Sequence, residues 1–328
     1  METKRFTKEE IEEAAKLIQS GNIVAFPTDT VYGLGADATN DEAVKKIFKA
    51  KGRPADRPIS VLVSDPKAMD QYALEVPKAA KTLAEKFWPG PLTIILKNAQ
   101  KFPKTVTGGK ETIGLRMPDH PVALEFIAAS GVPLATPSAN STGRPSPTKA
   151  EHVLEDLDGK ISAVIDGGET SFGIESTVLD LSNPAHPVIL RPGNISKEAI
   201  EETINQQVFS VEEKAQVASK AKHYEPSIPV YIVRSSFEKA IHEMTKQGEA
   251  IGLLASDEVI AEYKDSVAET FSLGISGDIK AANRNLFNGL RTLENTIATV
   301  VLVEPFEKGE DSFAFMNRLQ SAANEKSI

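Results

Sequence analysis

Short apolar runs alternate with amphipathic helical patterns along almost the whole chain, and this alternation restricts the fold more than any other feature. Such a rhythm predicts an α/β fold. Several later runs follow one another directly, so we expect a twisted mixed sheet with helices rather than a purely parallel one. The runs that read as strands in the first part of the chain are 22–26, 59–63, 93–97, 112–117, 132–136, 161–165, 176–181 and 187–191.

A polar segment divides the chain. The apolar periodicity fades after a helical pattern at 196–205, and residues 206–229 are polar with prolines near their end. A second α/β rhythm then begins, and 328 residues exceed what one hydrophobic core usually supports. We therefore expect a first domain at 1–205, a linker or lid at 206–229, and a small Rossmann-like α/β domain at 230–328. This last part carries neither a dinucleotide fingerprint nor a P-loop.

Several classes of chemistry are excluded by the composition. The chain has no cysteine, which removes disulfides, thiolate metal sites and cysteine nucleophiles. Its five histidines show no metal-ligand spacing, so no metal site built from protein side chains is predicted. The N-terminus is too charged for a signal peptide, and no apolar run approaches the roughly 20 residues that span a bilayer. We expect a cytoplasmic protein without membrane contact.

The charge is distributed unevenly. The net charge of −9 argues against a protein whose main task is to grip nucleic acid. Residues 51–150 nevertheless hold 14 Lys and Arg against 8 Asp and Glu. A confined basic surface suits a small polyanion such as a nucleotide, although chance variation on a solvated surface would give the same numbers.

Two segments combine rigid backbone with polar side chains. Residues 26–39 read as a strand followed by a loop of closely spaced hydroxyls, Thr28, Thr30 and Tyr32, which could hold a small polar ligand or simply stabilise a tight turn. In residues 49–63, prolines 54 and 58 fix an extended path that aims nearby cations, and arginine forks suit phosphate. The helix macrodipole would explain the lysines there but not Arg57.

Three further segments carry candidate side chains. Arg116 lies near the end of an apolar strand and needs an anionic partner, either Asp119 or a ligand carboxylate. The loop at 134–148 is dense in hydroxyls and amides, which fits recognition of a nucleotide or an amino acid but equally a plain surface connection. Glu175 and Ser176 open a strand after a glycine-rich stretch.

The motifs PTDTVYGLG, KGRP, LRMP, TPSAN, GIESTV and LRPG, in this order, resemble the YrdC-like family. The two-domain form of that family, the L-threonylcarbamoyladenylate synthases, is the nearest match, because KAKHYEP (220–226) is similar to its linker and AFMNRLQSAA (314–323) to its closing helix. The resemblance implies a YrdC-like first domain. It also implies that L-threonine, bicarbonate and ATP, with Mg²⁺ on the phosphates, give L-threonylcarbamoyl-AMP and pyrophosphate.

The resemblance also implies partners and site residues. Other proteins would transfer the threonylcarbamoyl group to adenosine 37 of tRNAs that read codons beginning with A, so this chain need not bind tRNA stably. Threonine would contact Thr30, Arg116, Thr136 and Ser176. The catalytic cations would be Lys51, Arg53 and Arg57. ATP would contact Arg53, Arg57, Thr112, Ser138, Asn140, Ser146, Arg191 and, from the linker, Tyr224. Where many relatives have His in a P-L-I-V-H-V strand, this chain has Leu62, and its linker keeps mainly Lys222, His223 and Tyr224 of the family's fuller motif.

Two other functions stay open at this point. A concave basic patch could hold a tRNA loop without catalysis, although no aromatic side chains alternate with the cations. Plain adenylation of the threonine carboxylate would use the same substrates apart from bicarbonate.

Overall fold

The computed structural model describes residues 2–211, 223–307, 309 and 312–328. The chain forms two compact units. The first unit comprises Met1–Thr142, Pro147–Ser171 and Glu175–Ala218, and the second comprises Gly143–Ser146, Phe172–Ile174 and Ser219–Ile328. Within the described residues, no helix is both long and apolar enough to span a membrane.

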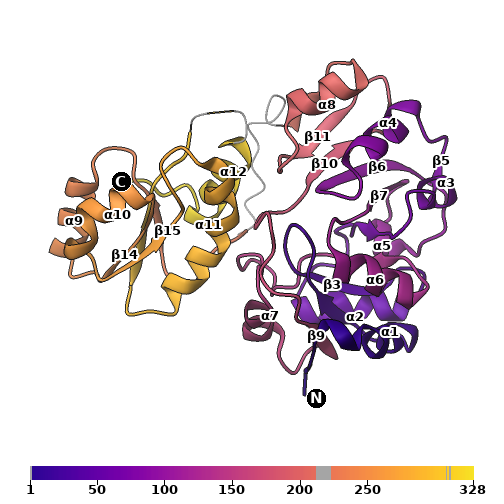
Figure 1. Ribbon diagram of the computed structural model, residues 1–328, viewed down its shortest axis with the longest axis horizontal. Coiled ribbons are helices and arrows are strands. Elements are labelled where there is room, and N and C mark those ends of the chain that lie inside the picture. Colours follow the sequence, from indigo (N-terminus) through magenta and orange to yellow (C-terminus); the bar gives the residue numbers. More distant parts are fainter. Residues whose placement is uncertain (1, 212–222, 308, 310–311) are drawn as a thin grey trace. The chain divides into compact units, whose positions relative to one another are not determined.

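The first unit is built on a mixed sheet, as the sequence predicts. Its strand order is β1-β9-β2-β3-β8-β4-β7-β6-β10-β11-β12, with β5 paired to β6 (Figure 1). Pairs such as β4 with β7 are parallel, whereas β2 with β3 and β6 with β7 are antiparallel. The strands are β1 (Lys4–Phe6), β2 (Val24–Phe26), β3 (Gly33–Asp37), β4 (Val61–Leu62), β5 (Ala73–Leu74), β6 (Leu92–Asn98), β7 (Thr112–Arg116), β8 (Leu134–Ala135), β9 (Ala163–Ile165), β10 (Thr177–Asp180), β11 (Val188–Arg191) and β12 (Phe209–Ser210).

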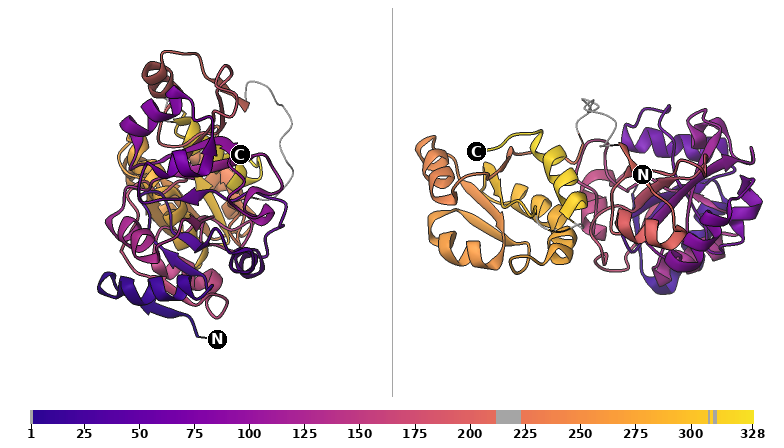
Figure 2. Two further views of the ribbon diagram at one scale, coloured as in Figure 1. Left: turned by 90° about the vertical axis from the view of Figure 1, so that its right-hand side faces the viewer. Right: turned by 90° about the horizontal axis from the view of Figure 1, so that it is seen from above.

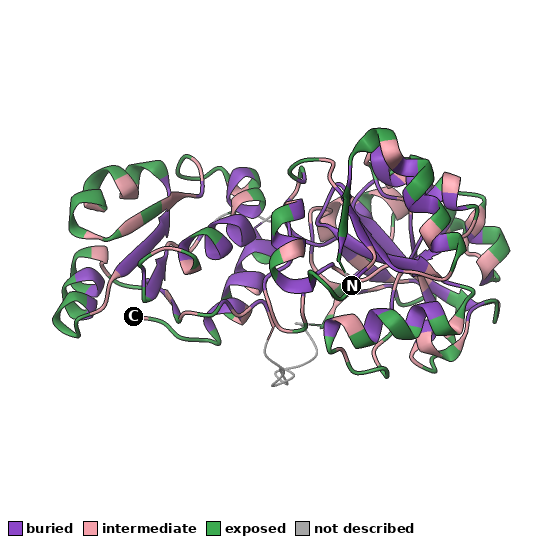
Figure 3. Cartoon of the chain, turned by 90° about the horizontal axis from the view of Figure 1, so that it is seen from below, coloured by how far each residue is buried: buried purple, intermediate pink, exposed green. Residues whose placement is uncertain are grey.

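Helices cover both faces of this sheet because side chains alternate along each strand. In β2, Val24 and Phe26 belong to the same apolar cluster as residues of α1 and α6, while Ala25 belongs to the cluster that contains α2 and α4. Figure 3 shows buried strands beneath helices whose outer faces are exposed. The helices are α1 (Ile11–Gln19), α2 (Asp41–Lys51), α3 (Ala68–Tyr72), α4 (Lys78–Phe87), α5 (Lys104–Thr107), α6 (Pro121–Ser130), α7 (Ala150–Leu157) and α8 (Lys197–Ile204).

The second unit has a parallel sheet in the order β13-β16-β14-β15. Its strands are β13 (Val230–Ile232), β14 (Ile251–Ala255), β15 (Glu269–Ser272) and β16 (Val300–Val303). One face packs against α9 (Phe237–Lys246) and α10 (Asp257–Tyr263). The helices α11 (Ile279–Glu294) and α12 (Ser312–Ala323) contact one another, and α11 also contacts β14 and β15. Figure 2 shows this C-terminal part of the chain in orange to yellow. This is the small Rossmann-like domain that the sequence predicts.

The structure differs from the sequence prediction in local details. The glycines of the 26–39 segment lie in strand β3 rather than in a loop. A Cβ on Gly33 would lie 2.4 Å from Cγ2 of Thr136, so the strand needs glycine to approach that side chain. The expected linker at 206–229 begins as sheet, because Phe209–Ser210 pairs with β11. Part of that segment, 212–222, lies outside the described residues, and so does Lys222.

Candidate active site

The loop between β2 and β3 is organised by one hydroxyl. The Thr28 Oγ1 atom donates to the carbonyl oxygen of Val31 at 2.6 Å and accepts from the backbone N–H of Thr30 at 3.2 Å. It also lies 3.0 Å from Oγ1 of Thr30. All three side chains are buried. Thr28 therefore stabilises a tight turn, which was one of the two interpretations of this segment. The turn also holds the hydroxyl of Thr30 in place.

Arg116 binds this loop from the end of β7. Its Nη1 donates to Oγ1 of Thr30 at 2.9 Å, its Nε donates to the carbonyl oxygen of Gly90 at 3.0 Å, and its Nη2 forms an ion pair with Asp29. The anionic partner is thus Asp29 and not Asp119, one of the two partners that the sequence suggested. Burial lowers the pKa of Arg116, and the Asp29 carboxylate opposes that shift. The two side chains are 7% and 2% exposed, so this is a buried charge pair.

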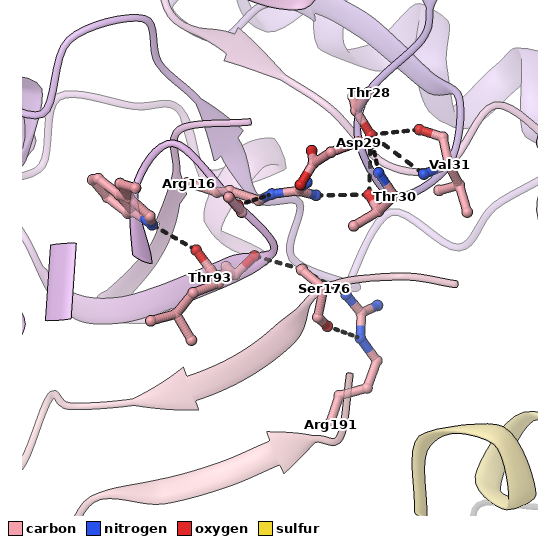
Figure 4. Close-up of polar contacts among 11 residues, drawn as sticks. Thr28, Asp29, Thr30, Val31, Thr93, Arg116, Ser176 and Arg191 are labelled. Atoms are coloured by element: carbon pink, nitrogen blue, oxygen red, sulfur yellow. Dashed lines mark hydrogen bonds and ion pairs between the residues drawn. The ribbon is translucent and has the colours of Figure 1, made fainter. Parts of the chain in front are cut away.

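A second group of polar side chains joins three neighbouring strands. Oγ1 of Thr93, on β6, lies 2.8 Å from Oγ of Ser176, directly before β10. Arg191, at the end of β11, donates from Nη2 to that same Oγ at 3.2 Å and from Nε to the carbonyl oxygen of Ser176 at 3.1 Å. Figure 4 shows this group in one view with Arg116 and the loop at 28–31. The structure therefore brings Thr30, Arg116, Ser176 and Arg191 together.

Cations gather beside this group. Burial lowers the pKa of Arg53, and the positive charges of Arg57 and Arg191 lower it further. Arg53 donates from Nη2 to the carbonyl oxygen of Pro58 at 3.2 Å, while its buried Nε has no hydrogen-bond partner in the described part of the chain. Arginines that repel one another are stabilised by a shared anion. The predicted phosphate role of Arg53, Arg57 and Arg191 thus has an electrostatic basis in the fold.

Lys51 is positioned differently from the other cations. It ends α2, is 4% exposed, and its ammonium donates to the carbonyl oxygens of Ser138 and Asn140. Its own carbonyl oxygen accepts from the N–H of Thr142 at 2.9 Å. We predicted Lys51 as a catalytic cation, but its donors are directed at the 138–142 loop. Lys51 therefore holds that loop in place, and its predicted catalytic role stays a prediction.

The buried Lys51 should give the stability a specific pH dependence. Burial, and secondarily Arg53, lower its pKa to about 7, compared with an ordinary lysine value near 10.4. Below pH 7 the amine is charged in both the folded and the unfolded chain, so the folded chain bears the full free-energy cost of burying that charge. Above pH 7 the folded chain releases the proton first, and stability rises. We expect the free energy of unfolding of wild type, relative to that of Lys51→Met, to be higher at pH 9 than at pH 7, by at most about 1.4 kcal/mol per pH unit. Urea unfolding at the two pH values measures this difference. An unchanged difference would contradict this assignment.

The remaining predicted residues lie at separate positions along the chain. Thr112 lies on the same face of β7 as Arg116, because the two are four residues apart on one strand. Thr136 follows β8, and its N–H donates to the carbonyl oxygen of Ser60 at 2.9 Å. Ser138 is bridged to Gly33 at the start of β3. Asn140 and Ser146 are buried, and Ser146 belongs to the second unit.

Leu62 and Tyr224, the two remaining positions singled out from the family pattern, lie in different units. Leu62 is a buried strand residue in the cluster with Phe26, so it contributes packing. Tyr224 lies in the second unit with a backbone φ of +59°. Its ring centroid is 5.0 Å from that of Phe287 and 5.0 Å from that of His223. Its predicted role as a lid stays a prediction.

Sequence reasoning missed two residues of this site. Asp29 was inside a quoted motif but was given no role, although a carboxylate between two threonines is a natural partner for a buried arginine. Thr93 was treated only as part of an apolar strand. A polar residue among Leu92, Ile94 and Ile95 was the available signal, because a buried hydroxyl requires a hydrogen-bond partner.

The hydroxyl of Tyr32 stabilises the fold rather than contacting a ligand. It donates to the carbonyl oxygen of Gly168 at 2.7 Å and accepts from the N–H of Gly167 at 3.2 Å, and burial raises its pKa. We expect Tyr32→Phe to lower the free energy of unfolding by about 1–2 kcal/mol, because two hydrogen bonds are lost. Catalytic constants should stay near wild type. A large loss of turnover in a folded Tyr32→Phe protein would instead place the hydroxyl in the site.

Known proteins resemble this chain along almost its whole length. The family model Sua5_yciO_yrdC, described as telomere recombination, matches residues 16–193, and the model for the C-terminal domain of threonylcarbamoyl-AMP synthase matches residues 195–324. The chain belongs to the threonylcarbamoyl-AMP synthase family. The synthase of Pyrococcus abyssi is 42% identical to it over 98% of this chain and 97% of its own length.

A further relative and a solved structure support the same assignment. The synthase of Bacillus subtilis is 41% identical over 97% of this chain and 94% of its own length. The crystal structure of P. abyssi Sua5 complexed with L-threonine superposes with a TM-score of 0.88 at 40% identity and covers 100% of this chain and 99% of that one. The two-domain form of the fold is therefore shared over the full chain.

Proposed function

We propose that this chain synthesises L-threonylcarbamoyl-AMP and pyrophosphate from L-threonine, bicarbonate and ATP, as a nucleotidyltransferase. The proposal rests on two groups of side chains. In the first, the buried Arg116 donates a hydrogen bond to Thr30. In the second, Arg191 donates a hydrogen bond to Ser176 and lies close enough to Arg53 to lower its pKa. The first group suits a small carboxylate and the second suits phosphate. Relatives along the full length bear the name of this synthase, and one relative's structure holds L-threonine.

The reaction needs positioning and charge neutralisation more than a protein nucleophile. The amine of threonine combines with bicarbonate to give an N-carboxylate and water. An oxygen of that carboxylate then attacks the α-phosphorus of ATP, its bond to phosphorus forms, and the bond to the leaving pyrophosphate breaks. Negative charge accumulates on the pyrophosphate, so fixed cations beside it lower the barrier.

The residues of this chain divide between the two substrates. Arg116 and the hydroxyls of Thr30 and Ser176 bind and orient threonine. Thr136 is a further threonine contact. Arg53, Arg57 and Arg191 offset charge on the phosphates. Lys51 holds the loop of Ser138 and Asn140 in place. The residues proposed to complete the ATP side are Thr112, Ser138, Asn140, Ser146 and Tyr224.

Mg²⁺ is proposed as a companion of ATP rather than a resident of the protein. Among the described residues there is no group of three or more His, Asp or Glu that could hold a metal ion. The ion would coordinate phosphate oxygens and reduce their negative charge. The product would then be consumed by threonylcarbamoyl-transfer proteins that modify adenosine 37 of tRNA in the cytoplasm, so stable tRNA binding by this chain is not required.

Pyrophosphate release with one substrate omitted at a time tests the proposal. Release should need ATP, L-threonine and bicarbonate together. Bicarbonate is the informative omission, because adenylation of the threonine carboxylate would continue in buffer purged of carbon dioxide. Release that persists without bicarbonate would overturn the proposed reaction in favour of that adenylation, and retention on tRNA without any ATP turnover would favour a binding module.

A further inference from the structure

One helix of the second unit holds a short segment from the first half of the chain. Residues Gly143–Ser146 cluster with the second unit, although the residues on both sides of them belong to the first. Arg144 forms a forked ion pair with Glu294: Nη1 donates to Oε2 at 2.7 Å and Nη2 to Oε1 at 2.5 Å. Arg291 donates to the carbonyl oxygen of Pro145 from Nη2 at 2.6 Å and from Nε at 3.2 Å.

These contacts are built into the second unit rather than added to its surface. The side chain of Glu294 is 1% exposed and Arg291 is 0% exposed. Both lie in the last turn of α11, three residues apart and hence on one face. Oε2 of Glu294 also accepts from the N–H and the Oγ of Ser227, at 2.6 and 3.0 Å. A carboxylate this buried depends on its partners, so Arg144 is a structural counterion.

The same helix contacts a second segment, Phe172–Ile174. Gly173 has a φ of +73°, and a Cβ there would lie 2.3 Å from the carbonyl oxygen of Arg284 on α11. Only glycine fits both the backbone angle and the approach. Both segments thus contact α11. The first contains Ser146 and begins three positions after Asn140, and Ser176 follows the second by two positions, so both include or adjoin proposed site residues.

We propose that Arg144, Glu294 and Arg291 are positioning residues for nucleotide binding, an inference that rests on the proposed function. The 138–146 stretch carries Ser138, Asn140 and Ser146. Lys51 holds its beginning, and the α11 contacts hold its end. Fixing both ends restricts the conformations of the stretch between them, so less conformational freedom is lost when ATP binds.

The test measures steady-state constants of full-length Arg144→Ala. We expect KM for ATP to rise about tenfold, since small misplacements of binding groups have effects of this size or larger. KM for L-threonine should change less than twofold, because Thr30 and Arg116 are fixed by bonds inside the first unit. The charge-swapped double variant Arg144→Glu with Glu294→Arg should recover part of the loss. Arg234→Ala is the matched control, because its pair with Glu307 in the second unit is exposed.

A second measurement is independent of catalysis. Amide hydrogen exchange at 138–146 should be faster in Arg144→Ala than in wild type and unchanged in Arg234→Ala. Wild-type KM values in a folded Arg144→Ala protein, or unchanged exchange at this stretch, would overturn the inference. An inactive wild-type chain would count against the proposed function instead, and the exchange result would still decide whether Arg144 holds the segment.

Discussion

Arg116→Met is expected to remove most product formation and to lower the free energy of unfolding by about 3–5 kcal/mol. The stability loss follows because methionine keeps the volume but leaves the Asp29 carboxylate buried without its partner. The activity loss follows because the guanidinium is the proposed contact for the threonine carboxylate, and one such electrostatic contact is worth about 3 kcal/mol in the transition state. Urea unfolding and initial rates of pyrophosphate release measure the two effects.

A second substitution separates these effects. In Arg116→Met with Asp29→Asn, no charge remains unpaired, so stability should return toward the wild-type value while activity stays low. Asp29→Asn alone should keep the hydrogen bond at Oδ1 but weaken the hold on the arginine, and KM for threonine should rise. Recovery of turnover together with stability in the double variant would show that Arg116 only supports the fold.

Arg53→Ala is expected to reduce kcat by about 10²-fold or more without unfolding the protein. The reason is that its charge, already disfavoured by burial and by Arg57 and Arg191, is proposed to be compensated by the phosphates. Removing it relieves repulsion in the free protein, so stability should hold or increase slightly. This opposite response of activity and stability would distinguish Arg53 from a structural arginine.

The matched control for Arg53→Ala is Arg5→Ala. Arg5 lies on the edge strand β1 and pairs with the exposed carboxylate of Glu151 and the partly exposed carboxylate of Asp166. Arg5→Ala removes one positive charge from the first unit, as Arg53→Ala does, and surface ion pairs contribute little to stability. Turnover near wild type is expected. Arg53→Ala with turnover equal to that of Arg5→Ala would remove Arg53 from the phosphate role.

The sequence predicted the fold well where local patterns decide it. Strands such as β6 and β7 are short segments rich in Ile and Leu, and helices such as α1 have one apolar face, so local sequence patterns find them. It did not predict β3, because glycines at 33 and 35 read as a loop. Their role depends on distant side chains, Thr136 and Phe26, that the fold brings close.

The site was predicted only as far as residue type reveals chemistry. Arg116 needed an anion, but nothing local selects Asp29 over Asp119, since the choice depends on β7 ending beside the β2–β3 loop. From the sequence, Lys51 is one more cation beside Arg53 and Arg57. Its direction toward the carbonyl oxygens of Ser138 and Asn140 is set by the end of α2, so it holds that loop, a role that residue type alone does not reveal.

The most direct test of the account is a crystal structure of the full chain with L-threonine and a non-hydrolysable ATP analogue. The account predicts the threonine carboxylate on the guanidinium of Arg116, beside the hydroxyls of Thr30 and Ser176. It predicts the phosphates against Arg53, Arg57 and Arg191. Threonine bound elsewhere, with Arg116 engaged only by Asp29, or phosphates away from these three arginines, would contradict it.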